Sequence, residues 1–503
     1  MDKFLGIELG STRIKSVLVG EDFKPVATGA FEWENKFENG FWTYGLDEMW
    51  EGVRASVASL ELSDVRGVGV SAMMHGYLAF DKAGELLTPF RTWRNTTTEK
   101  AATELTKRFD FNVPQRWSIA HLYQAILNGE THVCDIDYMT TLAGYVHWKL
   151  TGEKVLGVGD ASGMFPLENG GYNMRMADDF YKETGVRVTE VFPRILNAGD
   201  DAGRLTEEGA KLLGLPSRLA GTPLCPPEGD AGTGMVATNA IAPRTGNISA
   251  GTSVFAMIVL ENDLKNVYTE IDMVTTPTGK PVAMVHCNNC TSDLDAWVRV
   301  FGESLSCFGV DVSKSELYEK LYSMAVSDGA DSDCGGLLAY NFFSGEPIVG
   351  LDEGRPLFVR SLGADFTLSN FMRTLLFSSM ATLRIGMEIL WEENVSLEKI
   401  QGHGGLFKTP GVAQRLMAAA LGTPVDVMET AGEGGAWGMA LLAAYKNAGG
   451  GITLDKFLSE RVFANAGGDN LSKAEKSDMD GFEKFLKNYR RGLAVQKSAV
   501  ENV

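Results

Sequence analysis

Three glycine-rich turns in this sequence carry backbone N–H and hydroxyl groups of the kind that can bind an anion. Gly10-Ser11-Thr12 and Gly251-Thr252-Ser253 each join two apolar segments, and Gly402-His403-Gly404-Gly405 follows a third. Backbone N–H groups in such turns form concave anion sites, and glycine allows a ligand to approach closely. Each turn alone is also typical of an ordinary hairpin or loop. The three together predict a nucleotide whose phosphates are held between two lobes.

The first two turns lie in an internal repeat. GIELGSTRIKSVLVG (6–20) and GNISAGTSVFAMIVL (246–260) align when Gly10 is placed on Gly251, an offset of 241 residues in a chain of 503. A chain of this length exceeds the size at which a single hydrophobic core keeps growing. The repeat therefore predicts two similar halves, with the boundary near residue 240.

A candidate catalytic acid lies just before that boundary. Asp230 is flanked by Gly229, Ala231 and Gly232, and such small neighbours allow a substrate to approach the carboxylate. Phosphoryl transfer needs positioning, charge stabilisation and a carboxylate near the attacking hydroxyl. A loop aspartate that closes a turn is the alternative interpretation of the same residues.

The order of elements around the first turn argues against a dinucleotide-binding fold. FLGIELG (4–10) and STRIKSVLVG (11–20) predict two strands joined as a hairpin, whereas a dinucleotide-binding turn leads directly into a helix and has GxGxxG spacing. Further along, helical spacing predicts a helix within 46–60 with Asp47 as its N-cap. Residues 138–150 predict another helix, which should end at Thr151-Gly152, where glycine suits the left-handed C-cap.

The second half predicts elements that would position the third turn. Residues 370–395 have the periodicity of a long amphipathic helix. Residues 399–427 are typical of a strand, a glycine turn, a helix, a turn and a strand, and 432–450 of a helix that opens with glycines.

Composition excludes several classes of protein. The chain is 44% hydrophobic and 22% charged, which is typical of a globular protein with ample core. Its net charge of −19 opposes a nucleic-acid backbone or an anionic membrane as main partner. No signal segment or bilayer-length apolar run is evident, so we expect a cytoplasmic protein. Cys287 and Cys290 form a single CxxC pair, expected to be two buried thiols near a turn.

Taken in order along nearly the whole chain, these segments resemble the FGGY family of carbohydrate kinases, in the actin-like ATPase superfamily. The matching segments, in chain order, are GIELGSTRIKSVLVG, SAMMHGYLAFD with the Met-His-Gly triplet seen in xylulokinases, GDASGMF, PEGDAGTGMVATNA, GNISAGTSVF, GHGGLFKTPGVAQRLMAAALGTPV and GEGGAWGMALLAAY. The resemblance implies an α/β fold with two actin-like (ribonuclease H-like) lobes, mixed sheets flanked by helices, and a central cleft. It places the sugar site, the first phosphate motif and the catalytic Asp in residues 1–240, and the second phosphate motif and adenosine site in 241–503.

The resemblance also implies roles for individual residues. Asp230 corresponds to the general base, and Asp230 with Glu8 to the carboxylates near Mg²⁺; relatives usually have aspartate where this chain has Glu8. The ATP-binding residues implied are Gly10, Ser11, Thr12, Arg13, Gly251, Thr252, Ser253, Gly404, Gly405 and Phe407. The sugar-binding residues implied are Met74, His75, Gly76, Trp93, Arg94 and Asn95.

Several positions depart from the family pattern around the sugar. His121 and Gln124 stand where relatives commonly have lysine and tryptophan. Trp93-Arg94-Asn95 replaces a Trp-Asn-Asp segment, and Gly345-Glu346-Pro347 shortens a GERTP motif. These changes are compatible with a subfamily that acts on a different polyol.

The resulting hypothesis is an ATP-dependent sugar kinase that uses ATP and Mg²⁺ and acts on a small-molecule sugar. A ketopentose such as xylulose is the simplest substrate, with ribulose or another ketose or polyol as alternatives. A nucleotide- and sugar-binding sensor of the same fold, with little kinase activity, is the alternative from another class. The sequence leaves open whether the C-terminal segment 487–503 supports a homodimer or is a solvated helix.

Overall fold

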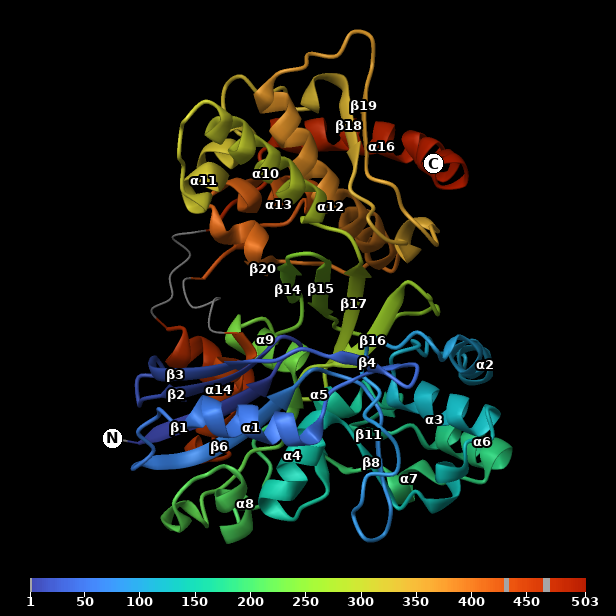
Figure 1. Cartoon of the computed structure of the whole chain (residues 1–503), viewed down its shortest axis with the longest axis vertical. Coiled ribbons are helices and arrows are strands. Elements are labelled where there is room, and N and C mark those ends of the chain that lie inside the picture. The colour runs from blue at the N-terminus through green and yellow to red at the C-terminus, as the bar shows by residue number, and fades with distance from the viewer. Residues whose placement is uncertain (1, 429–433, 465–470) are drawn as a thin grey trace. The chain divides into compact units, whose positions relative to one another are not determined.

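The computed structural model describes residues 2–428, 434–464 and 471–503, which form two compact units (Figure 1). Unit 1 comprises Met1–Ala242, Val259–Val282 and Glu433–Asn465. Unit 2 comprises Pro243–Ile258, Ala283–Gly432 and Ala466–Val503. A single cut of the chain therefore does not separate the units, because the chain contributes three segments to each.

The main sheet of unit 1 has the strand order β13-β6-β1-β2-β3. Strand β1 (Lys3–Leu9) runs antiparallel to β2 (Arg13–Val19) and parallel to β6 (Val65–Ala72). Strand β3 (Pro25–Glu32) is antiparallel to β2, and β13 (Glu228–Gly229) is parallel to β6. The hairpin predicted from the opening residues is confirmed.

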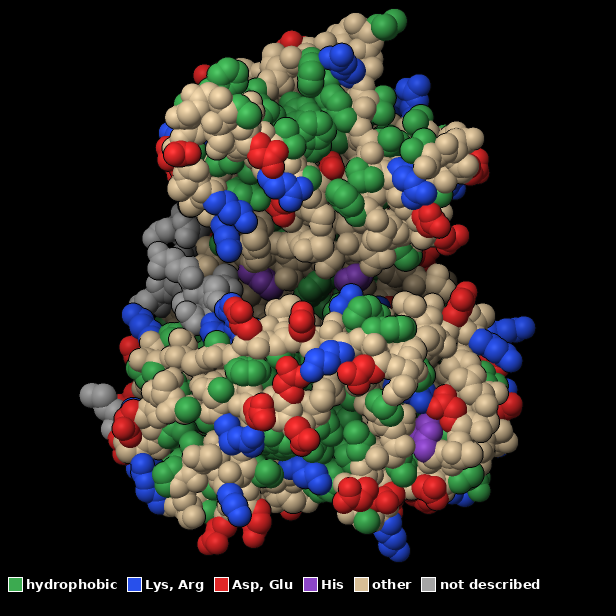
Figure 2. Space-filling model, in the orientation of Figure 1, with side chains coloured by type: hydrophobic (Ala, Val, Ile, Leu, Met, Phe, Trp, Pro, Cys, Tyr) green, Lys and Arg blue, Asp and Glu red, His purple; other side chains and the backbone are tan. Residues whose placement is uncertain are grey.

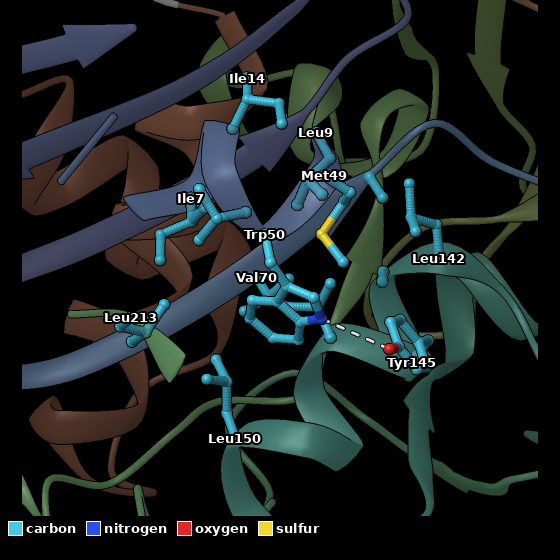
Figure 3. Close-up of a cluster of buried hydrophobic side chains, with 14 of the residues drawn as sticks. Ile7, Leu9, Ile14, Met49, Trp50, Val70, Leu142, Tyr145, Leu150 and Leu213 are labelled. Carbon is cyan, nitrogen blue, oxygen red and sulfur yellow. Dashed lines mark hydrogen bonds between the residues drawn. The ribbon is translucent and has the colours of Figure 1, made fainter. Parts of the chain in front are cut away.

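Side chains of β1 alternate between the two faces of this sheet. Ile7 lies on the face that packs with Trp50 of α1 (Leu46–Val57) and Tyr145 of α4 (Leu142–Thr151) in a hydrophobic core (Figure 3). Trp50 Nε1 donates a hydrogen bond to the Tyr145 hydroxyl at 3.4 Å, so the polar ends of both rings are paired inside the core.

The opposite face of β1 packs against α14 (Gly434–Ala448), which comes from the far end of the chain. A Cβ atom on Gly6 would lie 2.0 Å from the carbonyl oxygen of Ala436. Only glycine permits this approach of helix to strand. Glu8 is two residues further along β1 and therefore points to the same face as Gly6.

The remaining elements of unit 1 surround this sheet. The helices are α2 (Glu99–Phe109), α3 (Ser118–Leu127), α5 (Val158–Ala161), α6 (Met174–Thr184), α7 (Val188–Val191), α8 (Glu207–Leu212), α9 (Asp230–Ala237) and α15 (Leu454–Phe457). The strands are β4 (Lys36–Glu38), β5 (Phe41–Thr43), β7 (Leu78–Phe80), β8 (Tyr138–Thr140), β9 (Val155–Gly157), β10 (Leu167–Glu168), β11 (Gly171–Tyr172), β12 (Arg194–Leu196) and β16 (Ile271–Thr275).

Two helix predictions in unit 1 have different outcomes at their ends. Helix α4 ends at Thr151, and Gly152 adopts φ 81° as its C-cap, as predicted. The predicted start at residue 138 is wrong, because Tyr138–Thr140 forms strand β8 and the helix begins at Leu142 after the Thr141 cap. Helix α1 is confirmed, but Asp47 as its N-cap is wrong because Gly45 occupies that position. Asp47 lies in the first turn instead, where its charge favours the helix N-terminus.

In unit 2 the strands β17-β15-β14-β20-β21 are neighbours in one sheet. Their bounds are β14 (Thr245–Ala250), β15 (Val254–Val259), β17 (Pro281–Cys287), β20 (Lys399–His403) and β21 (Val425–Asp426). A smaller sheet pairs β18 (Leu337–Tyr340) with β19 (Leu357–Arg360). The helices are α10 (Ser292–Cys307), α11 (Lys314–Met324), α12 (Leu368–Glu392), α13 (Val412–Leu421) and α16 (Lys476–Asn502).

The predictions for the second half of the chain are confirmed by α12 and by the order β20, α13, β21. The glycine-opened helix is α14; the first two residues of the segment predicted for it, 432 and 433, lie outside the described residues. Among the described residues, no helix is long and apolar enough to cross a membrane. On the face shown in Figure 2, acidic and basic side chains are interspersed rather than gathered by sign.

Candidate active site

Three parallel strands of unit 1 bring the predicted catalytic residues to one edge of the sheet. Strands β1, β6 and β13 run parallel, so their carboxyl ends meet at the same edge. Glu8 lies near the end of β1, Met74 follows β6, and Asp230 follows β13 directly. Ligands of open α/β sheets bind at such carboxyl edges. The topology therefore gathers residues that are far apart in the sequence.

Asp230 is the first residue of helix α9. Its Oδ1 accepts hydrogen bonds from the backbone N–H groups of Met74 at 3.1 Å and Ala231 at 3.0 Å. Burial raises the pKa of the Asp230 carboxyl to about 6, and these hydrogen bonds oppose the rise. The bond from Met74 joins the Met-His-Gly segment to the carboxylate, as a sugar site beside a general base requires.

Glu8 lies at the N-terminus of α14. Its Oε2 accepts a hydrogen bond from the backbone N–H of Ala436 at 3.1 Å. Burial, and after it the charge of Asp230, raise the pKa of Glu8 to about 7. A Cβ atom on Gly435 would lie 2.4 Å from Glu8 Oε1. The extra methylene of glutamate, relative to the usual aspartate, thus extends the carboxylate to a helix N-terminus that admits it through glycine.

Two further buried acids lie beside Asp230, and the sequence analysis assigned neither a role. Glu228 accepts hydrogen bonds from the backbone N–H groups of Gly159 at 3.3 Å and Asp160 at 2.9 Å. Asp160 accepts a hydrogen bond from the Thr141 hydroxyl at 2.7 Å. Both are fully buried, and burial raises the pKa of Asp160 to about 7 and that of Glu228 to about 8.

The sequence carried one indication that both acids could be functional: each is a charged residue inside a segment of small residues. Asp160 lies in GVGDASG, and Glu228 lies in PPEGDAG two residues before Asp230. Acids in such segments are often buried next to a ligand or another acid. Pattern alone did not reveal that the two segments touch.

The carboxylates of Glu8 and Asp230 suit a magnesium ion that is bound partly by the phosphates of a nucleotide. They do not form a site that would hold the ion with protein ligands alone. Among the described residues, no group of three or more His, Cys, Asp or Glu is arranged to hold a metal ion. Mg²⁺ in phosphate-transfer sites is typically bound through one or two carboxylates together with substrate phosphates and waters. The pair of Glu8 and Asp230 would match that donor set, because the two carboxylates lie close enough for the charge of Asp230 to raise the pKa of Glu8.

The first phosphate turn is tied to the predicted sugar segment. The backbone N–H of Gly10 donates to the Arg13 carbonyl at 3.0 Å and closes the turn. The Ser11 hydroxyl accepts a hydrogen bond from Trp93 Nε1 at 3.1 Å. The Ser11 carbonyl accepts one from the Tyr44 hydroxyl at 2.6 Å. The exposed side chain of Arg13 leaves this turn and pairs with Glu32 on β3.

His75 is buried in a strained backbone conformation. It has φ 68° and is followed by Gly76 at φ 96°, and a non-glycine residue with positive φ is often found at functional sites. Its Nδ1 lies 3.1 Å from the Gly163 carbonyl, and Arg116 Nε lies 3.2 Å from its Nε2. Because arginine can only donate, Nε2 accepts and Nδ1 carries the proton. Burial and the Arg116 charge lower the pKa of His75 to about 3, so the ring is neutral.

The other predicted sugar residues differ in what their side chains can offer. Trp93 is 38% exposed, so one face of its indole ring is accessible. The guanidinium of Arg94 stacks on the Trp42 ring at 4.2 Å. The Asn95 amide is buried, accepts from the Trp42 N–H at 2.8 Å and donates to the carbonyls of Trp42 and Thr92 at 2.9 Å. Asn95 therefore fixes the backbone of this segment against Trp42 and Thr92. The side chain of Trp93, in contrast, is partly exposed.

The second phosphate turn lies in unit 2. The backbone N–H of Gly251 donates to the Ser253 carbonyl at 2.9 Å, two residues on, so this turn is one residue shorter than the first, where Gly10 donates to Arg13. The Thr252 carbonyl accepts a hydrogen bond from the Cys290 N–H at 2.8 Å. Cys290 and Cys287 are free, buried thiols, and burial raises the pKa of each. This is the arrangement expected for the CxxC pair.

The third glycine turn follows β20 in unit 2. Gly404 has φ 97°, and a Cβ atom there would lie 2.4 Å from the Ala250 carbonyl oxygen, so glycine is required. No atom lies within 4 Å of a Cβ atom on Gly405, which leaves its backbone open. Phe407 is 4% exposed and packs beneath Gly402. The structure brings Gly404 next to the end of β14, just before Gly251.

Comparisons with known proteins agree with this geometry. The profile of the FGGY family of carbohydrate kinases, N-terminal domain, matches residues 3–236, and that of the C-terminal domain matches residues 246–446. The boundary predicted near residue 240 lies between the two matches. A xylulose kinase of Haemophilus influenzae is 22% identical over 394 residues, which is 74% of this chain and 76% of that protein.

Solved structures share the fold at low sequence identity. The ligand-bound xylulose kinase of Lactobacillus acidophilus superimposes with a TM-score of 0.81 at 16% identity, covering 98% of this chain and 99% of that one. The gluconate kinase of the same organism superimposes with a TM-score of 0.81 at 16% identity, covering 98% of both chains.

The chain belongs to the FGGY family of carbohydrate kinases, because the two family profiles together match most of its length. It is an ATP-dependent sugar phosphotransferase with two α/β domains of the actin-like ATPase fold.

Proposed function

We propose that this kinase transfers the γ-phosphoryl group of ATP to a hydroxyl of a ketopentose such as xylulose, with Asp230 as general base. The observation that carries the proposal is the hydrogen bond from the Met74 N–H to Asp230 Oδ1, which places the carboxylate against the Met-His-Gly segment. The sequence relative from Haemophilus influenzae is itself a xylulose kinase. Ribulose or another ketose or polyol is the alternative substrate.

In this mechanism the sugar hydroxyl donates its hydrogen bond to Asp230 Oδ2, since both backbone hydrogen bonds go to Oδ1. As the sugar oxygen bonds to the γ-phosphorus, the bond to the bridging oxygen of ATP breaks and ADP leaves. Asp230 takes the hydroxyl proton. A carboxyl pKa raised to about 6 improves the proton acceptor while leaving it mostly ionised at neutral pH.

The three glycine turns supply the proposed contacts to the nucleotide. Backbone N–H groups at Gly10, Gly251 and Gly405 would bind phosphate oxygens, with the hydroxyls of the two hairpin turns beside them. Glu8 and Asp230 would hold a magnesium ion, which neutralises phosphate charge when bound. Trp93 offers an indole face to the C–H groups of the sugar. A homodimer and a cytoplasmic location stay predictions from the sequence.

The test is ADP release by the purified protein with Mg-ATP against ketopentoses, ketohexoses and polyols, each at several concentrations. We expect one ketopentose to raise the rate far above the rate without sugar. If a hexose or polyol were the best substrate, the proposed substrate would be wrong, but the proposed mechanism with Asp230 as general base would stand. If no compound raised the rate of ADP release while ATP still bound tightly, the result would contradict the proposal. It would favour the alternative of a nucleotide- and sugar-binding sensor.

A further inference from the structure

An ion pair beside His75 takes no part in the mechanism above. Arg116 Nη2 pairs with the Asp272 carboxylate, while Arg116 Nε donates to His75 Nε2 at 3.2 Å. Asp272 lies on β16, in the segment Val259–Val282 that returns to unit 1 from the second half of the chain. This segment therefore contributes a charge next to the Met-His-Gly residues.

His75 holds Arg116 in place. Both ring nitrogens of His75 are occupied, Nδ1 by the Gly163 carbonyl and Nε2 by Arg116. Its ring stacks with Trp117, the residue after Arg116, with ring centroids 6.4 Å apart. His75 thus orients the guanidinium instead of offering a nitrogen to a ligand. The Arg116 side chain is 24% exposed, although its Nη2 atom, which faces Asp272, is buried.

The carboxylate of Asp272 is tightly constrained. Asp272 is 7% exposed, and its Oδ1 accepts a hydrogen bond from Asn112 Nδ2 at 3.1 Å. Burial lowers the pKa of Arg116 only to about 10, so the guanidinium is charged at neutral pH. The pair therefore has no net charge, and each partner compensates the other away from water. Removing one partner of such a pair leaves a buried charge that favours a new counter-ion.

We infer that the Arg116–Asp272 pair selects neutral sugars and rejects sugar acids, and that Asp272 is the residue that sets this preference. This inference rests on the proposed function, since it concerns the substrate of the same site. A neutral sugar would offer hydroxyl oxygens to the N–H groups of Arg116 that His75 and Asp272 do not occupy. A sugar carboxylate would compete with Asp272 for the same guanidinium and would meet its negative charge.

The fold itself does not decide between these substrate classes. A xylulose kinase and a gluconate kinase superimpose on this chain equally well, each with a TM-score of 0.81. Xylulose is neutral and gluconate is an acid. The overall fold therefore does not select between them, and in the described part of unit 1 the guanidinium next to His75 is already neutralised by Asp272.

The experiment compares kcat/KM for D-xylulose and D-gluconate in the wild type and in Asp272→Asn. Asparagine keeps an acceptor for Asn112 but frees the Arg116 charge. We expect the wild type to prefer xylulose, and the ratio of kcat/KM values to move toward gluconate by about tenfold or more in the variant, mainly through KM, as for hydrogen bonds to a charged group. Asp272→Glu should restore the preference for xylulose.

Glu270→Gln is the matched control, because it removes one negative charge two residues away at an exposed position. It should leave the ratio unchanged. If Asp272→Asn is too unstable for steady-state assays, protection by D-gluconate against thermal unfolding, compared between Asp272→Asn and the wild type, gives the second measurement; the variant should gain protection that the wild type lacks.

Equal use of gluconate and xylulose by the wild type, or an unchanged ratio in Asp272→Asn, would overturn the inference while the kinase proposal stands. No phosphorylation of either compound or of any neutral sugar would overturn the proposed function itself, and the inference with it.

Discussion

Two sheets of the chain share an order of five neighbouring strands but carry different side chains at corresponding positions. One has the order β3-β2-β1-β6-β13, and the other, with six strands, has the order β16-β17-β15-β14-β20-β21, in which the five strands from β17 to β21 correspond. Each begins with a hairpin whose first strand pairs in parallel with a later strand. The internal repeat in the sequence is therefore a repeat of topology.

The difference lies in the side chains at the ends of these strands. With the hairpin turns aligned, Glu8 of unit 1 corresponds to Ser249 of unit 2. The fourth strand ends near Met74 in unit 1 and at His403 in unit 2, where the neutral ring lies 3.4 Å from Asn247 Nδ2. At the end of the first strand, unit 1 thus has a carboxylate where unit 2 has a neutral hydroxyl. Under the proposed function, the copy in unit 1 would serve the transfer chemistry.

Removing the carboxylate after the last strand should have the largest effect. Asp230→Asn should lower kcat by about 10³-fold, because it removes the proton acceptor, with ATP binding within a few-fold of the wild type. The control is Asp426→Asn at the end of β21, the corresponding strand of unit 2, where Asp426 accepts a hydrogen bond from Gln401 at 3.2 Å. Steady-state kinetics and ATP titration would check both. Comparable losses in the two variants would contradict the distinction between the units.

Exchanging the residues at the end of the first strand should have a smaller effect. Glu8→Gln should lower kcat by roughly 10- to 100-fold and raise the Mg²⁺ concentration needed for half-maximal rate, because the amide keeps the hydrogen bond to Ala436 but loses the charge. Ser249→Ala should stay within about threefold, since it removes only one neutral hydroxyl. The measurement is the rate against Mg²⁺ concentration. An unchanged Mg²⁺ dependence in Glu8→Gln would show that Glu8 only caps α14.

The two hairpin turns should differ in their tolerance of a methyl group. A Cβ atom on Gly251 meets no atom within 4 Å, whereas one on Gly10 would lie 3.2 Å from the Arg13 carbonyl oxygen. Gly251→Ala should fold normally and raise KM for ATP by about 5- to 10-fold, because the methyl group occupies the approach of a phosphate. Gly10→Ala should in addition lower the Tm. Normal KM values in both variants would exclude close phosphate contact at these turns.

A buried acid in unit 2 should affect stability alone. Glu346 is fully buried, accepts two hydrogen bonds from Asn289 at 3.2 Å, and has its pKa raised to about 7 by burial. The folded protein keeps this proton at pH values where the unfolded chain, with a pKa near 4.5, has lost it. Stability therefore falls as pH rises from about 4.5 to 7.

Glu346→Gln should remove that part of the pH dependence, at most about 3 kcal/mol between those limits. Melting curves of both proteins at pH 5 and pH 8 would check this, with Asp293→Asn as a partly comparable control in the same unit. An identical pH dependence of Tm in Glu346→Gln and the wild type would show that Glu346 stays ionised in the fold.

Local patterns predicted many elements of the fold correctly. Alternation predicted the β1–β2 hairpin, and glycine after an apolar helix predicted the end of α4 at Gly152. These features depend on neighbours within a few residues, where periodicity and capping act. The cap at Asp47 was wrong because any acid near a helix start fits the same pattern.

The candidate site was predicted in part. Asp230 and the Met-His-Gly segment were identified separately, and the structure brings them into hydrogen-bonding contact. Arg116, Asp272 and the acids at 160 and 228 were not identified, because each has its partner in a distant segment. Hydrophobic periodicity and short motifs involve residues close together in the sequence. They do not identify Asp272, whose partner Arg116 lies 156 residues earlier in the chain.

The sequence by itself determined the two similar halves and the positions of the glycine turns, because these follow from residue type, spacing and repetition. Only the tertiary structure decided which charges neutralise one another: Glu8 reaches the N-terminus of α14, 428 residues away, and Asp272 reaches Arg116. The physical reason is that burial makes electrostatics depend on distance in space and on the loss of water, and neither is written in the order of residues along a chain.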